Sequence, residues 1–133
     1  MTTLPETKAC KVNIENEWLT ISFNQPEKRN ALTSELTDDI KNIFDAARDD
    51  LSVRGVTMRG EGGIFCAGGD LKMFKTGFQG GEQGMKDVEE ASALTGAFFD
   101  MINSYPKPVI MLAEGAAMAG GLGMLCAGAV SYT

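Results

Sequence analysis

The chain has 133 residues, of which 44% are hydrophobic and 23% are charged, as in a single soluble globular domain. Its net charge of −6 and its scattered Lys and Arg residues argue against nucleic acid as a partner, because phosphates require a basic stripe. The chain contains no histidine, which excludes Ser-His and Cys-His catalytic dyads and removes the commonest general base.

The sequence predicts a cytoplasmic protein that neither spans nor binds a membrane. No run of 18 apolar residues is present, although a transmembrane helix requires one. The first residues combine no basic segment with an apolar run, so we expect no secretory signal. Cys10, Cys66 and Cys126 are widely spaced, which favours reduced thiols over a disulfide framework or a zinc site.

The first third of the chain predicts a β-hairpin followed by a helix. Residues Lys11–Ile14 and Trp18–Phe23 alternate apolar and polar side chains as two paired strands do. Thr33 or Ser34 is a suitable cap for the helix that follows, because a side-chain oxygen accepts from the first free amides. The apolar residues of this helix recur at steps of three and four along one face: Leu36, Ile40, Ile43, Phe44 and Ala47.

The next segments predict a strand at Val53–Met58, a helix from about Asp87 to Asn103, and a strand at Val109–Ala113. The apolar stripe Val88–Ile102 on the helix favours a place in the core over a substrate wall. The apolar run Val109–Ala113 is typical of a strand that is covered on both faces. This order of elements predicts an α/β sheet with right-handed crossovers.

The last segment, Leu122–Val130, has no polar face, and such a segment requires cover on every side. Residues Ser131–Thr133 would begin or continue a strand. We therefore expect residues 1–133 to form one domain that is incomplete at its carboxyl end.

Two glycine-bearing turns, Phe65–Lys72 and Ala116–Gly123, lead from predicted strands toward helix starts. Helix starts present unpaired N–H groups and the positive end of the helix dipole, and glycine allows close approach of a ligand. If the two strands are neighbours, the amides of Gly69 and Gly120 would point at one oxygen. Such an oxyanion hole loses about 3–4 kcal/mol of transition-state stabilisation when one donor is removed. The alternative is that both segments are ordinary turns.

Four segments resemble the crotonase superfamily of enoyl-CoA hydratases and isomerases: Asn24–Leu32, Phe65–Lys72, Pro106–Ile110 and Ala119–Gly121. They occur in the order found in the family, and the resemblance covers about residues 11 to 128. It implies an α/β fold of the crotonase-like type, a superhelix of ββα units. It also implies a homotrimer or a hexamer for the whole protein.

The resemblance implies that the backbone N–H groups of Gly69 and Gly120 hold the oxygen of an acyl-CoA thioester as it becomes an enolate. No metal or redox cofactor is expected, because main-chain amides stabilise the enolate and the coenzyme A thioester is itself the substrate.

The resemblance also assigns substrate-binding positions along the coenzyme A and beside the first amide donor. These positions are Lys28, Arg29, Ala31, Ala67, Asp70, Leu71 and Lys72. A purely structural alternative remains for some of them, since Asp70 is a suitable helix N-cap and Lys28 and Arg29 are suited to a solvated loop.

The chain departs from the family at the proton-transfer groups. The hydratases use two glutamates, of which the first matches Gly123 here and the second would lie beyond Thr133. Glu61 and Glu114 lie near the two turns, in places that are ordinary for glutamate. Three hypotheses remain open: an enzyme whose base lies outside the chain, an inactive fragment that binds coenzyme A weakly, and an interaction protein that kept only the fold.

Overall fold

The predicted hairpin forms the antiparallel edge of a five-stranded sheet. In the computed structural model, which describes residues 3–132, β1 (Cys10–Glu15) pairs antiparallel with β2 (Trp18–Phe23). Asn16 and Glu17 connect them with φ angles of 51° and 64°, as a two-residue turn that follows the strand twist requires. The hairpin prediction is therefore confirmed.

Three parallel strands complete the sheet: β3 (Gly55–Gly60), β4 (Val109–Leu112) and β5 (Val130–Tyr132), in the order β1-β2-β3-β4-β5. The predicted α/β sheet is confirmed, but β3 begins and ends two residues later than predicted. Val53 is buried although its backbone forms a turn, in which its N–H donates to the Asp50 carbonyl at 3.0 Å. A buried side chain alone therefore does not locate the start of a strand.

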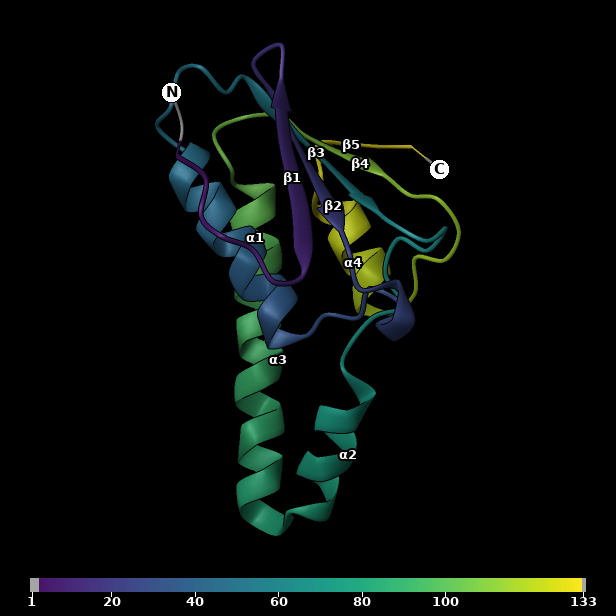
Figure 1. The fold of residues 1–133 in the computed structure, drawn as a ribbon. Coiled ribbons are helices and arrows are strands. Elements are labelled where there is room, and N and C mark those ends of the chain that lie inside the picture. The colour runs from purple at the N-terminus through teal and green to yellow at the C-terminus, as the bar shows by residue number, and fades with distance from the viewer. Residues whose placement is uncertain (1–2, 133) are drawn as a thin grey trace.

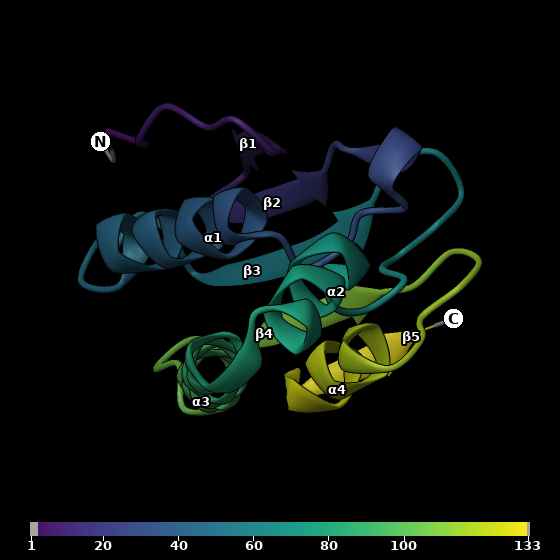
Figure 2. The same cartoon turned by 90° about the horizontal axis from the view of Figure 1, so that it is seen from below.

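The core lies between one face of this sheet and the helices. Along β2, Leu19 and Ile21 are fully buried, whereas Trp18 and Thr20 on the opposite face are partly exposed. After the short helix η1 (Pro26–Lys28), α1 (Ser34–Ala47) runs along the sheet, as Figure 2 shows. The Thr33 hydroxyl accepts from the Leu36 N–H at 3.2 Å, so Thr33 is the N-cap. All five predicted apolar residues of α1 are buried.

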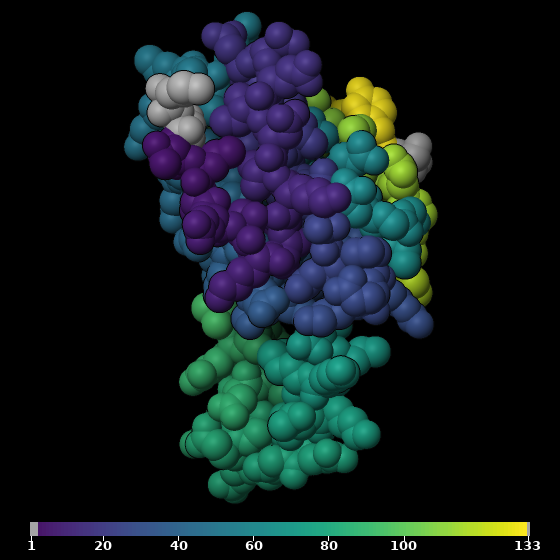
Figure 3. All heavy atoms as spheres, in the orientation of Figure 1, coloured from purple at the N-terminus to yellow at the C-terminus, as the bar shows by residue number. Residues whose placement is uncertain are grey.

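Helices α2 (Leu71–Gln79) and α3 (Gly81–Asn103) fold back on each other and project beyond the sheet (Figures 1 and 3). We call residues 71–94 the helical arm. Within it, a Cβ on Gly84 would overlap the carbonyl of Gly77, so glycine permits the close approach of the two helices.

The structure corrects two predictions about α3. The helix begins at Gly81 rather than near Asp87, because its first turns are exposed and lack the apolar stripe that marks a helix in a sequence. Only the second half of the predicted stripe lies in the core: Phe98 and Ile102 are buried, whereas Leu94 is 61% exposed. The prediction that the whole stripe is core is therefore wrong for the helical arm.

Within residues 3–132, the predicted cover on both faces of the Val109–Ala113 strand and on every side of the segment Leu122–Val130 is also absent. Leu112 in β4 is 36% exposed, because the helices cover the opposite face of the sheet. Helix α4 (Gly120–Ala127) packs Met124 into the core, but Leu122 is 51% exposed and Val130 is 44% exposed. No helix in the described part of the chain combines the length and the apolar character needed to cross a membrane.

Candidate functional site

Main-chain hydrogen bonds hold three loops side by side at the carboxyl ends of the parallel strands. The Leu32 N–H donates to the Gly68 carbonyl at 2.8 Å, and the Met118 N–H donates to the Cys66 carbonyl at 3.0 Å. The loop before α1, the loop before α2 and the loop before α4 are thereby placed together. The two predicted glycine turns belong to the second and third of these loops.

The two turns are in direct contact. Gly68 has a φ of 106°, and a Cβ on it would lie 2.9 Å from the Ala119 Cβ and 3.3 Å from the Gly120 nitrogen. In the same way, a Cβ on Gly120 would lie 3.8 Å from the amide nitrogen of Gly69. The turns approach this closely because glycine at position 68 supplies both the backbone angle and the space.

The N–H groups of Gly69 and Gly120 donate to no acceptor among residues 3–132. By contrast, the three amides that follow Gly120 donate to the carbonyls of Met118 and Ala119 at 2.8–3.1 Å. Both glycines are partly exposed, so each free amide can donate to a ligand.

Ala119 precedes the Gly120 amide and holds a strained backbone, with φ 50° and ψ −119°. Such angles normally belong to glycine and cost a residue with a Cβ about 1–3 kcal/mol. Strain of this kind gathers at functional sites, where the surrounding structure fixes the direction of a group. At Ala119, the surrounding structure fixes the direction of the peptide that carries the Gly120 N–H.

Beside the turns lies a groove of about 720 Å³, which contains eight of the nine site residues predicted from the sequence. The ninth, Gly120, follows Ala119 at its edge. The residues that line the groove are Glu27, Lys28, Arg29, Ala31, Thr33, Ala67, Gly69, Asp70, Leu71, Lys72, Phe74, Met118 and Ala119. Five of these were not predicted as site residues: Glu27, Thr33, Phe74, Met118 and Ala119. Phe74 lies one helical turn after Asp70.

The charged residues of the groove differ in what they contact. The Asp70 carboxylate accepts from the amides of Lys72 at 3.1 Å and Met73 at 3.4 Å, so Asp70 is the N-cap of α2, as the structural alternative predicts. Lys28, Arg29 and Lys72 are exposed and form no ion pair in the described part of the chain. These three cations can therefore bind an anionic ligand.

Asn30, for which sequence reasoning assigned no role, holds in place the cationic loop Lys28–Ala31, which carries Lys28 and Arg29. Its side chain is fully buried, accepts from the Gln25 amide at 2.9 Å, and donates to the carbonyls of Glu61 at 3.1 Å and Ile64 at 2.8 Å. A buried side chain with three such bonds holds the loop that follows η1 against the loop that follows β3. Asn30 lies in the segment Asn24–Leu32, which resembles the family. Its role could not be predicted, because its partners Glu61 and Ile64 are distant in the sequence.

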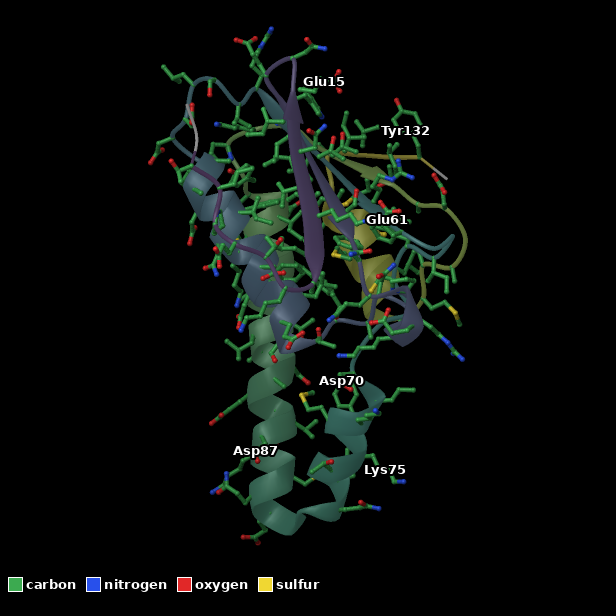
Figure 4. The ribbon with its side chains drawn as sticks, viewed as in Figure 1. Glu15, Glu61, Asp70, Lys75, Asp87 and Tyr132 are labelled. Carbon is green, nitrogen blue, oxygen red and sulfur yellow. The ribbon has the colours of Figure 1, made fainter. Side chains whose placement is uncertain are left out.

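The two glutamates considered for proton transfer do not line the groove. The Glu114 Oε1 lies 3.1 Å from the Arg59 Nη2, in a surface ion pair. Figure 4 shows Glu61 beside the strands, whereas Asp70 lies at the start of α2. Burial raises the pKa of the Cys66 thiol above its usual value, so this thiol stays protonated at neutral pH and is a poor nucleophile.

Comparisons with known proteins agree with the resemblance. The family model described as enoyl-CoA hydratase/isomerase matches residues 18–131. A Bacillus subtilis (strain 168) protein named "Probable enoyl-CoA hydratase" is 37% identical over 93 residues, which are 70% of this chain and 34% of that protein.

Two solved structures superpose on most of the chain. An enoyl-CoA hydratase/isomerase from Marinobacter aquaeolei has a TM-score of 0.83 and 30% identity, over 92% of this chain and 47% of that one. Pseudomonas aeruginosa AtuE has a TM-score of 0.82 and 30% identity, over 93% of this chain and 47% of that one. The chain thus spans 34–47% of the length of these three relatives.

Proposed function

The chain belongs to the enoyl-CoA hydratase/isomerase family of the crotonase superfamily, and from this we propose that it forms the acyl-CoA thioester site of such an enzyme. The observation that carries the proposal is the pair of free main-chain amides, Gly69 and Gly120, on two touching turns beside a groove.

The proposed chemistry takes place at the thioester oxygen. Both amides donate to this oxygen, and negative charge grows on it as a proton leaves the neighbouring carbon. Donors that are fixed before the reaction need no reorganisation, which is why one donor of this kind is worth about 3–4 kcal/mol in the transition state. The positive end of α4, whose first residue is Gly120, favours the same charge.

The coenzyme A portion is proposed to lie along the cationic rim of the groove. Lys28, Arg29 and Lys72 suit its phosphates, because ammonium and guanidinium groups both donate to phosphate oxygens. The small side chains of Ala31 and Ala67 leave room for the narrow pantetheine chain, and Leu71 adds an apolar contact.

We assign proton transfer to a group outside residues 1–133. Of the two carboxylates that line the groove, Asp70 is engaged as a helix cap and Glu27 is exposed on η1 beside Lys28 and Arg29. Gly123 has no side chain, and Glu61 and Glu114 do not line the groove. The chain by itself is therefore expected to bind a thioester without hydrating it. A metal or redox cofactor has no role in the proposal, and a trimeric or hexameric assembly stays a prediction for the whole protein.

Calorimetry with acetoacetyl-CoA, which mimics the enolate, tests the proposal. We expect saturable binding that is tighter than binding of free coenzyme A. Replacing Gly69 or Gly120 by glycolic acid turns one amide into an ester and removes the N–H. This change should weaken acetoacetyl-CoA binding about 10- to 100-fold, as expected for a hydrogen bond to a charged group.

The matched control is the same replacement at Gly63, in an open loop where no atom lies within 4 Å of the position that a Cβ would take. It should leave the affinity unchanged. Absence of saturable heat with acetoacetyl-CoA would refute the proposal and favour an inactive fragment or an interaction protein.

A further inference from the structure

The two peptides that carry the proposed donor amides are each held by their carbonyl groups. In a planar trans peptide the carbonyl and the N–H point in opposite directions, so a bond that holds the carbonyl also fixes the direction of the N–H. In the peptide that carries the Gly120 N–H, the Ala119 carbonyl accepts from the amides three and four residues further on, at 3.0 Å and 3.1 Å. Helix α4 therefore orients this donor through the bonds of its own first turn.

The other donor depends on a residue that is distant in the sequence. In the peptide that carries the Gly69 N–H, the Gly68 carbonyl accepts from the Leu32 N–H at 2.8 Å. Leu32 and Gly69 also form an isolated parallel bridge. The direction of the Gly69 N–H is therefore set from the loop before α1.

The Leu32 side chain reaches the Gly120 donor. A Cβ on Gly120 would lie 2.8 Å from the Leu32 Cδ1, so the leucine occupies the space beside the Gly120 backbone. Gly120 does not have a positive φ, so this close contact, and not the backbone angle, is what favours glycine there. Leu32 is itself partly buried and packs against the core, which holds its backbone and its side chain in place.

We propose that Leu32 is a positioning residue for both donors of the thioester site. Its N–H holds the peptide that carries the Gly69 N–H, and its side chain packs on Gly120. This inference rests on the proposed function. Donors that are fixed in advance stabilise negative charge without reorganisation, so a residue that fixes them matters for binding of an enolate and not for binding of coenzyme A alone. Leu32 does not line the groove, so it acts through the two glycines and not by touching the ligand.

The test measures, by calorimetry on the full chain and its variants, the ratio of the affinity for acetoacetyl-CoA to the affinity for free coenzyme A. Replacing Leu32 by its α-hydroxy analogue turns the amide into an ester, which removes the N–H and keeps the side chain. This change should lower the ratio about 3- to 10-fold, because a small misplacement of a group at the reacting centre is costly. Leu32→Ala keeps the N–H, removes the contact with Gly120 and should lower the ratio as well. Leu32→Met nearly conserves the side-chain volume and should keep most of the ratio.

Two matched controls lie away from the groove. The Arg54 N–H donates to the Glu17 carbonyl at 2.7 Å, so the α-hydroxy analogue of Arg54 removes a comparable bond between two loops. Leu4→Ala removes another partly buried leucine that packs against the core. Both changes should leave the ratio as it is in the wild-type chain, which separates positioning of the donors from a general loss of stability.

A cycle of double variants shows through which donor the Leu32 N–H acts. In a chain whose Gly69 is already replaced by glycolic acid, the Leu32 ester should lower the ratio no further. If folded Leu32 variants keep the wild-type ratio, or if the Leu32 ester acts equally with and without the Gly69 amide, the positioning role is refuted and the proposed function stands. If the wild-type chain does not bind acetoacetyl-CoA, both are refuted. The ester and Leu32→Ala are measured separately, so either supplies the ratio if the other does not fold.

Discussion

Helices α1 and α3 both carry an apolar stripe, but they use it differently. In α1, the stripe is buried along its whole length against the sheet. In α3, only Gly84, Phe98 and Ile102 are buried, and the first turns of the helix lie in the arm that projects beyond the sheet (Figure 1). An apolar stripe therefore shows which side of a helix faces a partner, but not whether the sheet is that partner.

The groove lies where these two regions meet. Its cationic loop, Lys28–Ala31, belongs to the compact body, whereas Leu71, Lys72 and Phe74 belong to the helical arm. The body contributes fixed geometry through buried contacts, and the arm contributes residues that are held mainly by the contact of α2 with α3. We expect substitutions in the body to change global stability and substitutions in the arm to act locally.

The largest expected effect comes from a comparison of two substitutions, one at a buried ring of the compact body and one at an exposed ring of the helical arm. Phe44 is 1% exposed and its ring centroid lies 4.4 Å from that of Tyr105. Phe44→Ala should lower the free energy of unfolding by about 3–5 kcal/mol, measured by urea denaturation. Phe78→Ala in the arm should change it by less than about 0.5 kcal/mol. Equal losses in the two variants would show that the arm is part of the core.

A second effect tests how firmly the body holds its side of the groove. Asn30→Ala removes three hydrogen bonds, and it takes this partner from the buried Gln25 amide and from the part-buried carbonyls of Glu61 and Ile64. The expected loss of unfolding free energy is about 2–3 kcal/mol. Asn24→Ala is the matched control, because the Asn24 side chain is exposed, and it should be nearly neutral. A neutral Asn30 variant would contradict this account of the loop.

A third prediction compares the effect of the same substitution at two glycines of α3. In Gly84→Ala, the new methyl group would overlap the Gly77 carbonyl, so the arm should lose about 1–3 kcal/mol of local stability. In Gly96→Ala, nothing lies within 4 Å of the new methyl group, and the better helix propensity should add about 0.5–1 kcal/mol. Hydrogen exchange of the amides of α2 and α3 measures both. Changes of the same sign would contradict the packing of α2 on α3.

The smallest effect concerns α2, the helix of the arm whose first residues line the groove. Asp70→Ala removes the N-cap of α2 and should cost about 1 kcal/mol, seen as faster hydrogen exchange at Lys72 and Met73. Asp70→Asn keeps an acceptor at the cap and should restore most of the protection. A loss that Asn does not restore would show that the charge of Asp70, rather than its capping bond, matters.

Local patterns predict the parts of the fold that local physics determines. The hairpin and α1 follow from alternation, helical spacing and the cap at Thr33. The exposure of Leu94 and Leu112 could not be predicted in this way, because it depends on where other elements end in space. The sequence shows which side of a segment is apolar, but it does not show the surface against which that side packs.

The same limit applies to the candidate site. Gly69 and Gly120 could be predicted from two turns that resemble family segments, and Asp70 from its place before a helix. The role of Asn30 could not, because its hydrogen-bond partners Glu61 and Ile64 are distant in the sequence. Such residues become visible only when distant backbone segments are brought together.

The three loops of the site are joined through backbone atoms, as the bonds from Leu32 to Gly68 and from Met118 to Cys66 show. Bonds of this kind do not depend on which side chains the loops carry. The groove surface can therefore be redesigned while its supporting frame is kept. A combinatorial library confined to Ala31, Ala67 and Met118 would explore new ligand preferences at little risk to folding.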